Sequence, residues 1–176
     1  MRILMLGNSF TFANNMPAML AELTGAEVVH HTRGGARLAE QLNPKTKTGA
    51  KTQDALDHEF WDYVVLQEMS NGPVTSRKSF LKNAGRLCAW IREEGAVPVL
   101  FATWAYQKGS QAMADMEMSY DEMAKGLQDA CHEAAHWLPT SGSAFMNWRI
   151  RRSCMRRTVS IRARPARGLQ PRPLPL

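Results

Sequence analysis

The sequence predicts an α/β fold in which a mainly parallel sheet is covered by helices on both faces. Short runs of apolar or β-branched residues end at small or polar residues, as buried strands of parallel sheets do; they cover residues 2–6, 27–31, 63–67 and 97–103. Helical spacing of apolar residues follows each run, over residues 17–24, 36–42 together with 53–60, 79–94 and 120–135. Strand and helix alternate four times, and that order implies right-handed crossovers between parallel strands.

Local signals support individual elements of this pattern. The first strand, Arg-Ile-Leu-Met-Leu, is closed by Gly7. Pro17 occupies an early position of the first long helix, where its missing N–H costs nothing. Gly95 follows the helix over residues 79–94, as expected where a helix stops. These signals place the turns of the fold between the strands and helices.

Length and composition fit one globular domain with a substantial core. The chain has 176 residues, of which 44% are apolar and 22% charged. Its 3 Cys are scattered, which excludes a disulfide scaffold and indicates reduced thiols. No apolar run approaches the roughly 18–20 residues of a membrane helix, and the apolar N-terminal run is too short for a signal peptide. We therefore expect a cytoplasmic protein without a membrane partner.

The positive charge is confined to the C-terminal end of the chain. Residues 1–148 hold 13 of the 22 Lys and Arg and all 16 Asp and Glu, whereas residues 149–176 hold 9 Arg and no acid. We predict a folded domain over residues 1–148 and an irregular Arg- and Pro-rich tail over residues 149–176. Binding of nucleic acid through this tail is an alternative function, but the tail lacks aromatic side chains that stack on bases, so we do not expect a nucleic-acid partner.

Ligands of open parallel sheets bind at the carboxyl ends of the strands, so the loops that follow each strand are the candidate site. The first loop, Gly-Asn-Ser-Phe-Thr over residues 7–11, lacks the Gly-x-Gly-x-x-Gly and Walker patterns and therefore does not predict nucleotide binding. It offers the hydroxyl of Ser9 as a nucleophile, although Ser9 or Thr11 could equally be a helix cap. Gly34 and Gly35 could admit an oxygen close to backbone N–H groups, or simply form a tight turn.

Three short sequence blocks at the ends of the predicted strands together resemble the SGNH (GDSL-like) hydrolase superfamily. The resemblance is to the branch with a Gly-Asn-Ser-Phe-Thr nucleophile block. The three blocks are residues 3–11, Arg-Gly-Gly-Ala-Arg-Leu over residues 33–38, and Val-Val-Leu-Gln-Glu-Met-Ser over residues 64–70, and the resemblance covers roughly residues 1–135. It implies a flavodoxin-like three-layer α/β/α sandwich. It also implies hydrolysis of a small carboxylic ester, such as an acetylated carbohydrate, by a serine and without cofactor or metal.

The resemblance also implies residue roles. Ser9 matches the nucleophile, and its own N–H would be one donor to the oxyanion. Gly35 or its neighbour Gly34 matches the second donor. The family's third donor is an asparagine in a Gly-x-Asn-Asp block, and in the corresponding loop this chain offers three polar side chains: Gln67, Ser70 and Asn71.

The family's Asp-x-x-His block, which supplies the base that a nucleophilic serine needs, is missing. No Asp or Glu follows Glu133, and no His follows His136. If the codons of residues 153–167 are read from their third nucleotide, they permit Leu-Tyr-Ala-Glu-Asp-Gly-Lys-His-Pro-Ser-Ala-Ala-Gly-Ser, and the codons of residues 168–176 permit an Ala-rich helix. We predict a frameshift between about residues 132 and 145.

We expect this frameshift to leave the last strand and the terminal helix incomplete and to impair or abolish catalysis. The alternative is a non-catalytic small-ligand-binding module.

Two further patterns remain open. The segment His-Glu-Ala-Ala-His over residues 132–136 matches the H-E-x-x-H zinc pattern, but no third ligand follows it, which favours chance spacing on a helix. Trp104, Tyr106 and Trp61 could line an acyl or sugar pocket or belong to the core.

Overall fold

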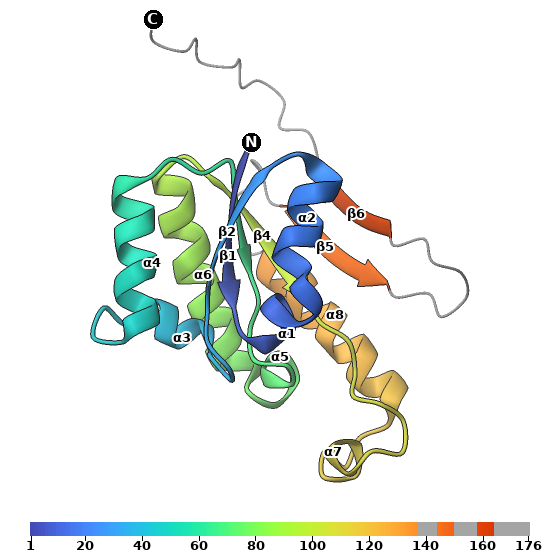
Figure 1. The fold of residues 1–176 in the computed structure, drawn as a ribbon. Helices are drawn as coiled ribbons and strands as arrows, with labels where there is room; N and C mark the ends of the chain where they lie inside the picture. The colour runs from blue at the N-terminus through green and yellow to red at the C-terminus, as the bar shows by residue number, and fades with distance from the viewer. Residues whose placement is uncertain (137–143, 150–157, 164–176) are drawn as a thin grey trace, which may run out of the picture.

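A single sheet runs through the centre of the molecule (Figure 1). The structure, a computed structural model, describes residues 1–136, 144–149 and 158–163. The strands lie in the order β2-β1-β3-β4-β5-β6; the first five are parallel and β6 is antiparallel to β5. Their bounds are β1 Arg2–Gly7, β2 Glu27–Thr32, β3 Tyr63–Leu66, β4 Val97–Ala102, β5 Ala144–Arg149 and β6 Thr158–Ala163. The order 2-1-3-4-5 is that of flavodoxin-like sheets, as predicted.

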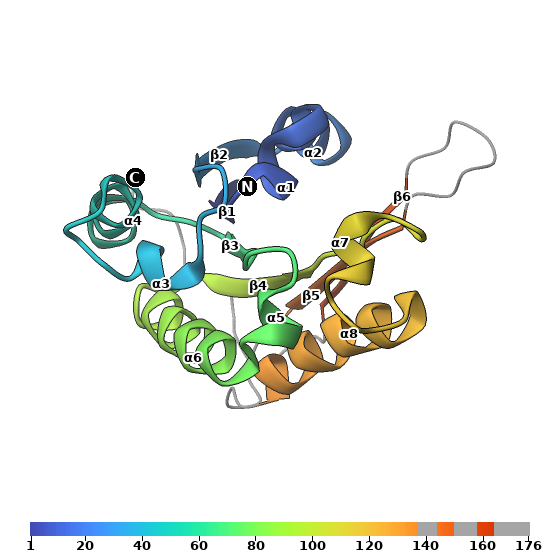
Figure 2. The same ribbon diagram turned by 90° about the horizontal axis from the view of Figure 1, so that it is seen from below.

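Helices cover the sheet on both sides and complete the three-layer sandwich (Figure 2). The helix α2 (Met16–Thr24) packs on one face, whereas α4 (Lys47–His58), α6 (Arg77–Glu93) and α8 (Tyr120–His136) pack on the other. Short helices lie in the loops: α1 Ser9–Phe12, a 3-10 turn at Ala13–Asn15, α3 Leu38–Gln41, α5 Gly72–Thr75 and α7 Gln111–Ala114. No helix in the described part of the chain is long and apolar enough to cross a membrane.

The first strand is buried on both faces. Ile3 and Met5 pack beneath α2 with Leu20, whereas Leu4 and Leu6 point to the opposite face and its larger apolar cluster. Each of these strand side chains is at most 2% exposed. Burial on both faces explains why the strand is a continuous apolar run rather than an alternating one.

The predicted elements are confirmed, but α4 begins six residues earlier than the apolar spacing indicated. Its first turn is polar, so no apolar period marks it. The helix starts because the Thr46 hydroxyl oxygen accepts a hydrogen bond from the Gly49 N–H at 3.0 Å. Gly49 also lets this turn approach the preceding loop, since a Cβ atom there would lie 1.9 Å from the Asn43 carbonyl oxygen.

The strand that the frameshift is expected to leave incomplete is described as β5 over Ala144–Arg149. Strand β5 pairs with β4 in register from Val99 opposite Ala144 to Ala102 opposite Asn147, and so satisfies the backbone groups of the β4 edge. Strand β6 corrects the expectation of an irregular tail for Thr158–Ala163, where β-branched and apolar residues alternate with polar ones. The expected loss of a terminal helix falls on residues outside the described ranges.

Two glycine substitutions test this packing. Gly49→Ala should lower the free energy of unfolding by about 1–3 kcal/mol, because the added methyl group meets a backbone carbonyl that cannot swing away. Gly85→Ala, within α6 and with nothing within 4 Å of the added atom, should raise it by about 0.5–1 kcal/mol. Urea unfolding would measure the free energy of unfolding of both variants. If both substitutions raised it, or both lowered it, relative to the wild type, the packing described would be contradicted.

Candidate active site

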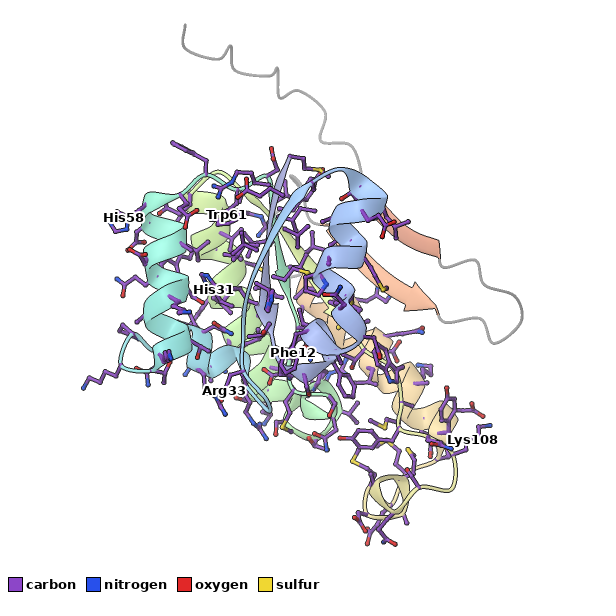
Figure 3. All side chains as sticks on the ribbon, in the orientation of Figure 1. Phe12, His31, Arg33, His58, Trp61 and Lys108 are labelled. Carbon is purple, nitrogen blue, oxygen red and sulfur yellow. The ribbon has the colours of Figure 1, made fainter. Side chains whose placement is uncertain are left out.

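The loops at the carboxyl ends of the first four strands meet at one end of the sheet. Phe12 and Arg33, which belong to the loops after β1 and β2, lie at this end in Figure 3, whereas His58 and Trp61 lie toward the opposite end. Ser9 is the first residue of α1 and is half-buried. The hydroxyl of Ser9 does not cap the helix, because the side-chain oxygen of Asn8 accepts the hydrogen bond from the Phe10 N–H at 3.1 Å.

Asn8 connects the loop that carries Ser9 to two other loops. It is 2% exposed. Its side-chain amide donates to the Ala36 carbonyl oxygen at 3.0 Å and to the Glu68 carbonyl oxygen at 3.5 Å. Its backbone N–H donates to Gln67 Oε1 at 3.0 Å. The position of the residue next to Ser9 is therefore fixed by the loops after β2 and β3.

Gln67 lies beneath these loops, with both ends of its side-chain amide engaged. It is 0% exposed, and its Oε1 accepts from the Asn8 N–H and from the Thr11 hydroxyl, the latter at 2.9 Å. Its Nε2 donates to the Glu68 carbonyl oxygen. Gly7 is required here, because a Cβ atom would lie 2.3 Å from Thr11 Oγ1 and 2.7 Å from Gln67 Oε1. The structure thus uses the Gln67 side chain to join loops, and Thr11 belongs to the same buried network.

Glu68 adds a buried carboxylate that the sequence analysis did not assign a role. It is 6% exposed, and its two oxygens accept from the Met69 N–H at 2.7 Å and the Leu38 N–H at 3.3 Å. Burial raises the pKa of this carboxyl group, and the two backbone hydrogen bonds oppose that rise. Its position immediately after a buried strand could have indicated a role from the sequence. In the structure, the carboxylate connects the loops after β2 and β3 through these two hydrogen bonds.

The two glycines of the second loop form a tight turn. The Ala36 N–H donates to the Arg33 carbonyl oxygen at 3.0 Å, and Gly35 adopts a φ of 67°, which favours glycine. Both glycines are exposed, and a Cβ atom at Gly34 or Gly35 would meet nothing within 4 Å. Backbone conformation rather than close packing therefore explains Gly35, and the backbone of the turn remains accessible.

Ser70 and Asn71 are directed toward the loop after β4. The Ser70 hydroxyl forms a hydrogen bond of 2.8 Å with the Tyr106 hydroxyl, and the Ser70 carbonyl oxygen accepts from the Thr103 hydroxyl at 3.2 Å. The Asn71 amide donates to the sulfur of Met116 at 3.4 Å. Of the three side chains predicted for the third loop, only Gln67 therefore reaches the loop of Ser9 through a hydrogen bond.

His30 and His58 contact residues of their own elements. His30 Nδ1 forms a hydrogen bond with the Thr32 hydroxyl at 2.8 Å, and His58 Nδ1 lies 3.2 Å from an Asp54 carboxylate oxygen. His31 lies between α4 and the sheet (Figure 3), and its burial lowers the pKa of the imidazole.

The H-E-x-x-H segment lies on α8, where its glutamate makes an ion pair. Both Nε and Nη2 of Arg77 donate to the Glu133 carboxylate, the former at 2.9 Å. His132 is exposed, and the side chain of His136 lies outside the described residues. Within the described part of the chain, no group of three His, Cys, Asp or Glu side chains could hold a metal ion.

Trp61 lies far from the candidate site, contrary to the idea that it lines a pocket there. Its ring is buried at the amino end of the sheet, where Nε1 donates to the Ala55 carbonyl oxygen at 2.9 Å. The guanidinium group of Arg2 lies over the ring, 4.3 Å from its centroid. The aromatic run Phe-Trp over residues 60–61 therefore belongs to the core and its rim.

Comparison with solved structures identifies the family. A protein from Slackia heliotrinireducens assigned to the SGNH hydrolases is 50% identical, covers 82% of this chain and 77% of its own, and superposes with a TM-score of 0.78. The chain belongs to the SGNH hydrolase family. No protein-family model and no curated protein matches its sequence.

More distant structures share the fold alone. A DUF4886 family protein from Bacteroides uniformis is 20% identical with a TM-score of 0.55, over 78% of this chain and 63% of its own. A mutant of Axe2, an acetyl-xylooligosaccharide esterase from Geobacillus, is 13% identical with a TM-score of 0.53, over 83% of this chain and 75% of its own.

The central position of Gln67 can be measured. Gln67→Leu leaves the Asn8 N–H and the Thr11 hydroxyl buried without an acceptor, so we expect it to lower the free energy of unfolding by about 2–4 kcal/mol. Thr11→Val removes only one of the two donors and should cost about 1 kcal/mol. Denaturant titrations compare the two variants, and an equal loss in both would show that Gln67 does not join the loops energetically.

The buried carboxyl group of Glu68 predicts a pH dependence of definite sign. Because its pKa is raised in the folded chain, the folded state binds this proton at pH values where the unfolded state has released it. The stability of the wild type should therefore fall, relative to Glu68→Gln, as pH rises from the ordinary glutamate pKa through the raised one.

Glu27→Gln is the matched control for this pH series, because hydrogen bonds from Arg2 lower the pKa of Glu27. The stability that Glu27 contributes is present above the ordinary glutamate pKa and is lost as pH falls through the lowered pKa. The stability of the wild type relative to Glu27→Gln should therefore rise with pH, opposite to the trend for Glu68→Gln. The free energy of unfolding would be measured from about pH 3 to pH 8, a range that includes the ordinary glutamate pKa. If the difference between wild type and variant changed with pH in the same direction for Glu68→Gln and Glu27→Gln, the raised pKa of Glu68 would be contradicted.

Proposed function

We propose that this SGNH family member is a serine ester hydrolase in which Ser9 is the nucleophile. The observation that carries the proposal is the position of Ser9, half-buried at the end of β1, with Asn8 rather than Ser9 capping the helix. The N–H groups of Ser9 and Gly35 are the proposed oxyanion donors, with Gly34 as the alternative to Gly35. The exposed turn of the two glycines and the hydrogen bond from Asn8 to Ala36 support this assignment.

In the proposed reaction, Ser9 Oγ bonds to the acyl carbon, and the negative charge that develops on the carbonyl oxygen is held by the backbone donors. The bond to the alcohol then breaks, the leaving alkoxide takes a proton from solvent, and water hydrolyses the acyl-serine. The serine proton needs an acceptor. With no His after His136 and no acid after Glu133, we propose that solvent accepts it and that turnover is impaired. Serine enzymes that lack their triad retain about 10³–10⁴-fold acceleration over water.

The proposed substrate is a small carboxylic ester, with an acetylated carbohydrate as the class to try first. The similarity of fold to an acetyl-xylooligosaccharide esterase supports that choice. The first alternative is a non-catalytic module that binds a small ligand in the same place. The second is phosphate binding by the 9 Arg of residues 149–176, which predicts an affinity for nucleic acid that falls steeply with salt and disappears when these residues are deleted.

Hydrolysis of p-nitrophenyl acetate tests the nucleophile and the missing base together. The wild type should turn over slowly, and Ser9→Ala should fall below it to the acceleration that binding and the backbone donors supply without a nucleophile. Replacing residues 153–166 by the alternative-frame sequence Leu-Tyr-Ala-Glu-Asp-Gly-Lys-His-Pro-Ser-Ala-Ala-Gly-Ser should raise kcat by about 10²–10⁴-fold, the usual contribution of a general base.

The matched control carries the same replacement with alanine at its histidine, and it should stay at the slow rate. Ser9→Ala would also be made in both chains, the original and the one with the replaced segment. If it changed the rate in neither, the hydrolase proposal would be wrong, and the non-catalytic binding module would be the remaining function.

A further inference from the structure

We infer that Phe10 and Trp104 form an aromatic platform that binds the ring of a ring-bearing ester, an aryl ester or an acetylated pyranose, beside Ser9. The inference rests on the proposed function, since it names the substrate class of the same site. The two rings are stacked, with centroids 4.9 Å apart and an interplanar angle of 5°. Phe10 follows Ser9 in the chain, and Trp104 belongs to the loop after β4, so the platform joins the first and fourth strand-end loops.

Part of the platform is exposed to solvent. Trp104 is 39% exposed although Phe10 stacks against it. Phe12, which is 41% exposed, lies three residues after Ser9 on α1 and therefore on the same side of that helix. Exposed aromatic side chains beside a candidate nucleophile are typical of ligand sites, because exposed apolar surface is otherwise kept small and scattered.

The residues around both rings are fixed, so the platform is formed before a ligand arrives. The Phe10 N–H is held by the side chain of Asn8. On the other side, the Thr103 hydroxyl donates to the Ser70 carbonyl oxygen, and Ala105 is 4% exposed within a small apolar cluster that includes Met113. A surface fixed in advance loses little conformational entropy on binding.

The shape of the platform favours a ring over a flexible chain. A planar surface contacts a planar partner over its whole face, and stacked rings gain free energy beyond that of buried area. A linear alkyl chain must lose rotamer freedom to lie flat on the same surface. The shared chemistry is a flat face of C–H or π character, which an aryl ester and an acetylated pyranose both offer.

Binding to the Ser9→Ala chain tests the platform without relying on hydrolysis. Dissociation constants for phenyl acetate, a mono-O-acetylated methyl pyranoside and hexyl acetate would be measured by ligand-observed NMR. At least one ring ester should bind about three- to tenfold more tightly than hexyl acetate, the ratio expected for one aromatic contact. Adding Trp104→Ala should abolish the difference, whereas Trp104→Phe should retain most of it.

Phe60→Ala is the matched control, since Phe60 is an aromatic side chain that is 87% exposed and precedes the buried Trp61 at the opposite end of the sheet. It should leave all three constants unchanged. Trp104→Leu keeps apolar bulk without a flat face and replaces the alanine variant if thermal unfolding shows that variant to be unfolded. Preference for only one of the two ring esters would support the platform and identify an arene or a sugar as its ligand.

Equal binding of hexyl acetate and both ring esters, or a Trp104 variant that weakens all three probes alike, would overturn the platform. Failure of the proposed function is a separate result: it would appear as hydrolysis independent of Ser9, while the order of the three dissociation constants would still decide the platform.

Discussion

The arrangement of the site depends on two buried amide side chains that satisfy backbone groups of different loops. Loops at strand ends carry N–H and C=O groups without ladder partners, and burying such groups unpaired is costly. Asn8 and Gln67 supply partners to the loops after β1, β2 and β3 at once. Each amide can both donate and accept, so two side chains hold three segments that are far apart in the sequence.

The same constraint explains the residues around these amides. Gly7 leaves room for the hydroxyl of Thr11 and the oxygen of Gln67, and Gly72 leaves room for the side chain of Glu68, whose Cγ would lie 2.9 Å from an added Cβ atom. Glu68 is kept in a buried position that raises the pKa of its carboxyl group, and its two backbone hydrogen bonds offset part of that penalty. A polar network this buried favours one arrangement of the loops.

The fold could be predicted from the sequence because both-sided burial and helical spacing leave a direct trace in the order of apolar residues. The resemblance to the SGNH hydrolases rested on short blocks in the strand-end loops, and the 50% identical relative confirms the family. The early start of α4 could not be predicted from apolar spacing, because a hydroxyl cap and a glycine contact begin it. The stack of Phe10 on Trp104 depends on tertiary packing that no local pattern records.

Covalent labelling of the chain by an alkyl fluorophosphonate is the most direct measurement of the central claim, that the loops position Ser9 as a nucleophile. Intact-mass and peptide-mapping spectra should show one adduct, located on Ser9. Labelling should be slow, because no Asp or Glu follows Glu133 and no His follows His136 to supply the missing base. It should disappear when the loops are released in Gln67→Leu. An adduct on another serine, or Ser9 labelling that is unaffected by unfolding of the chain, would contradict the account.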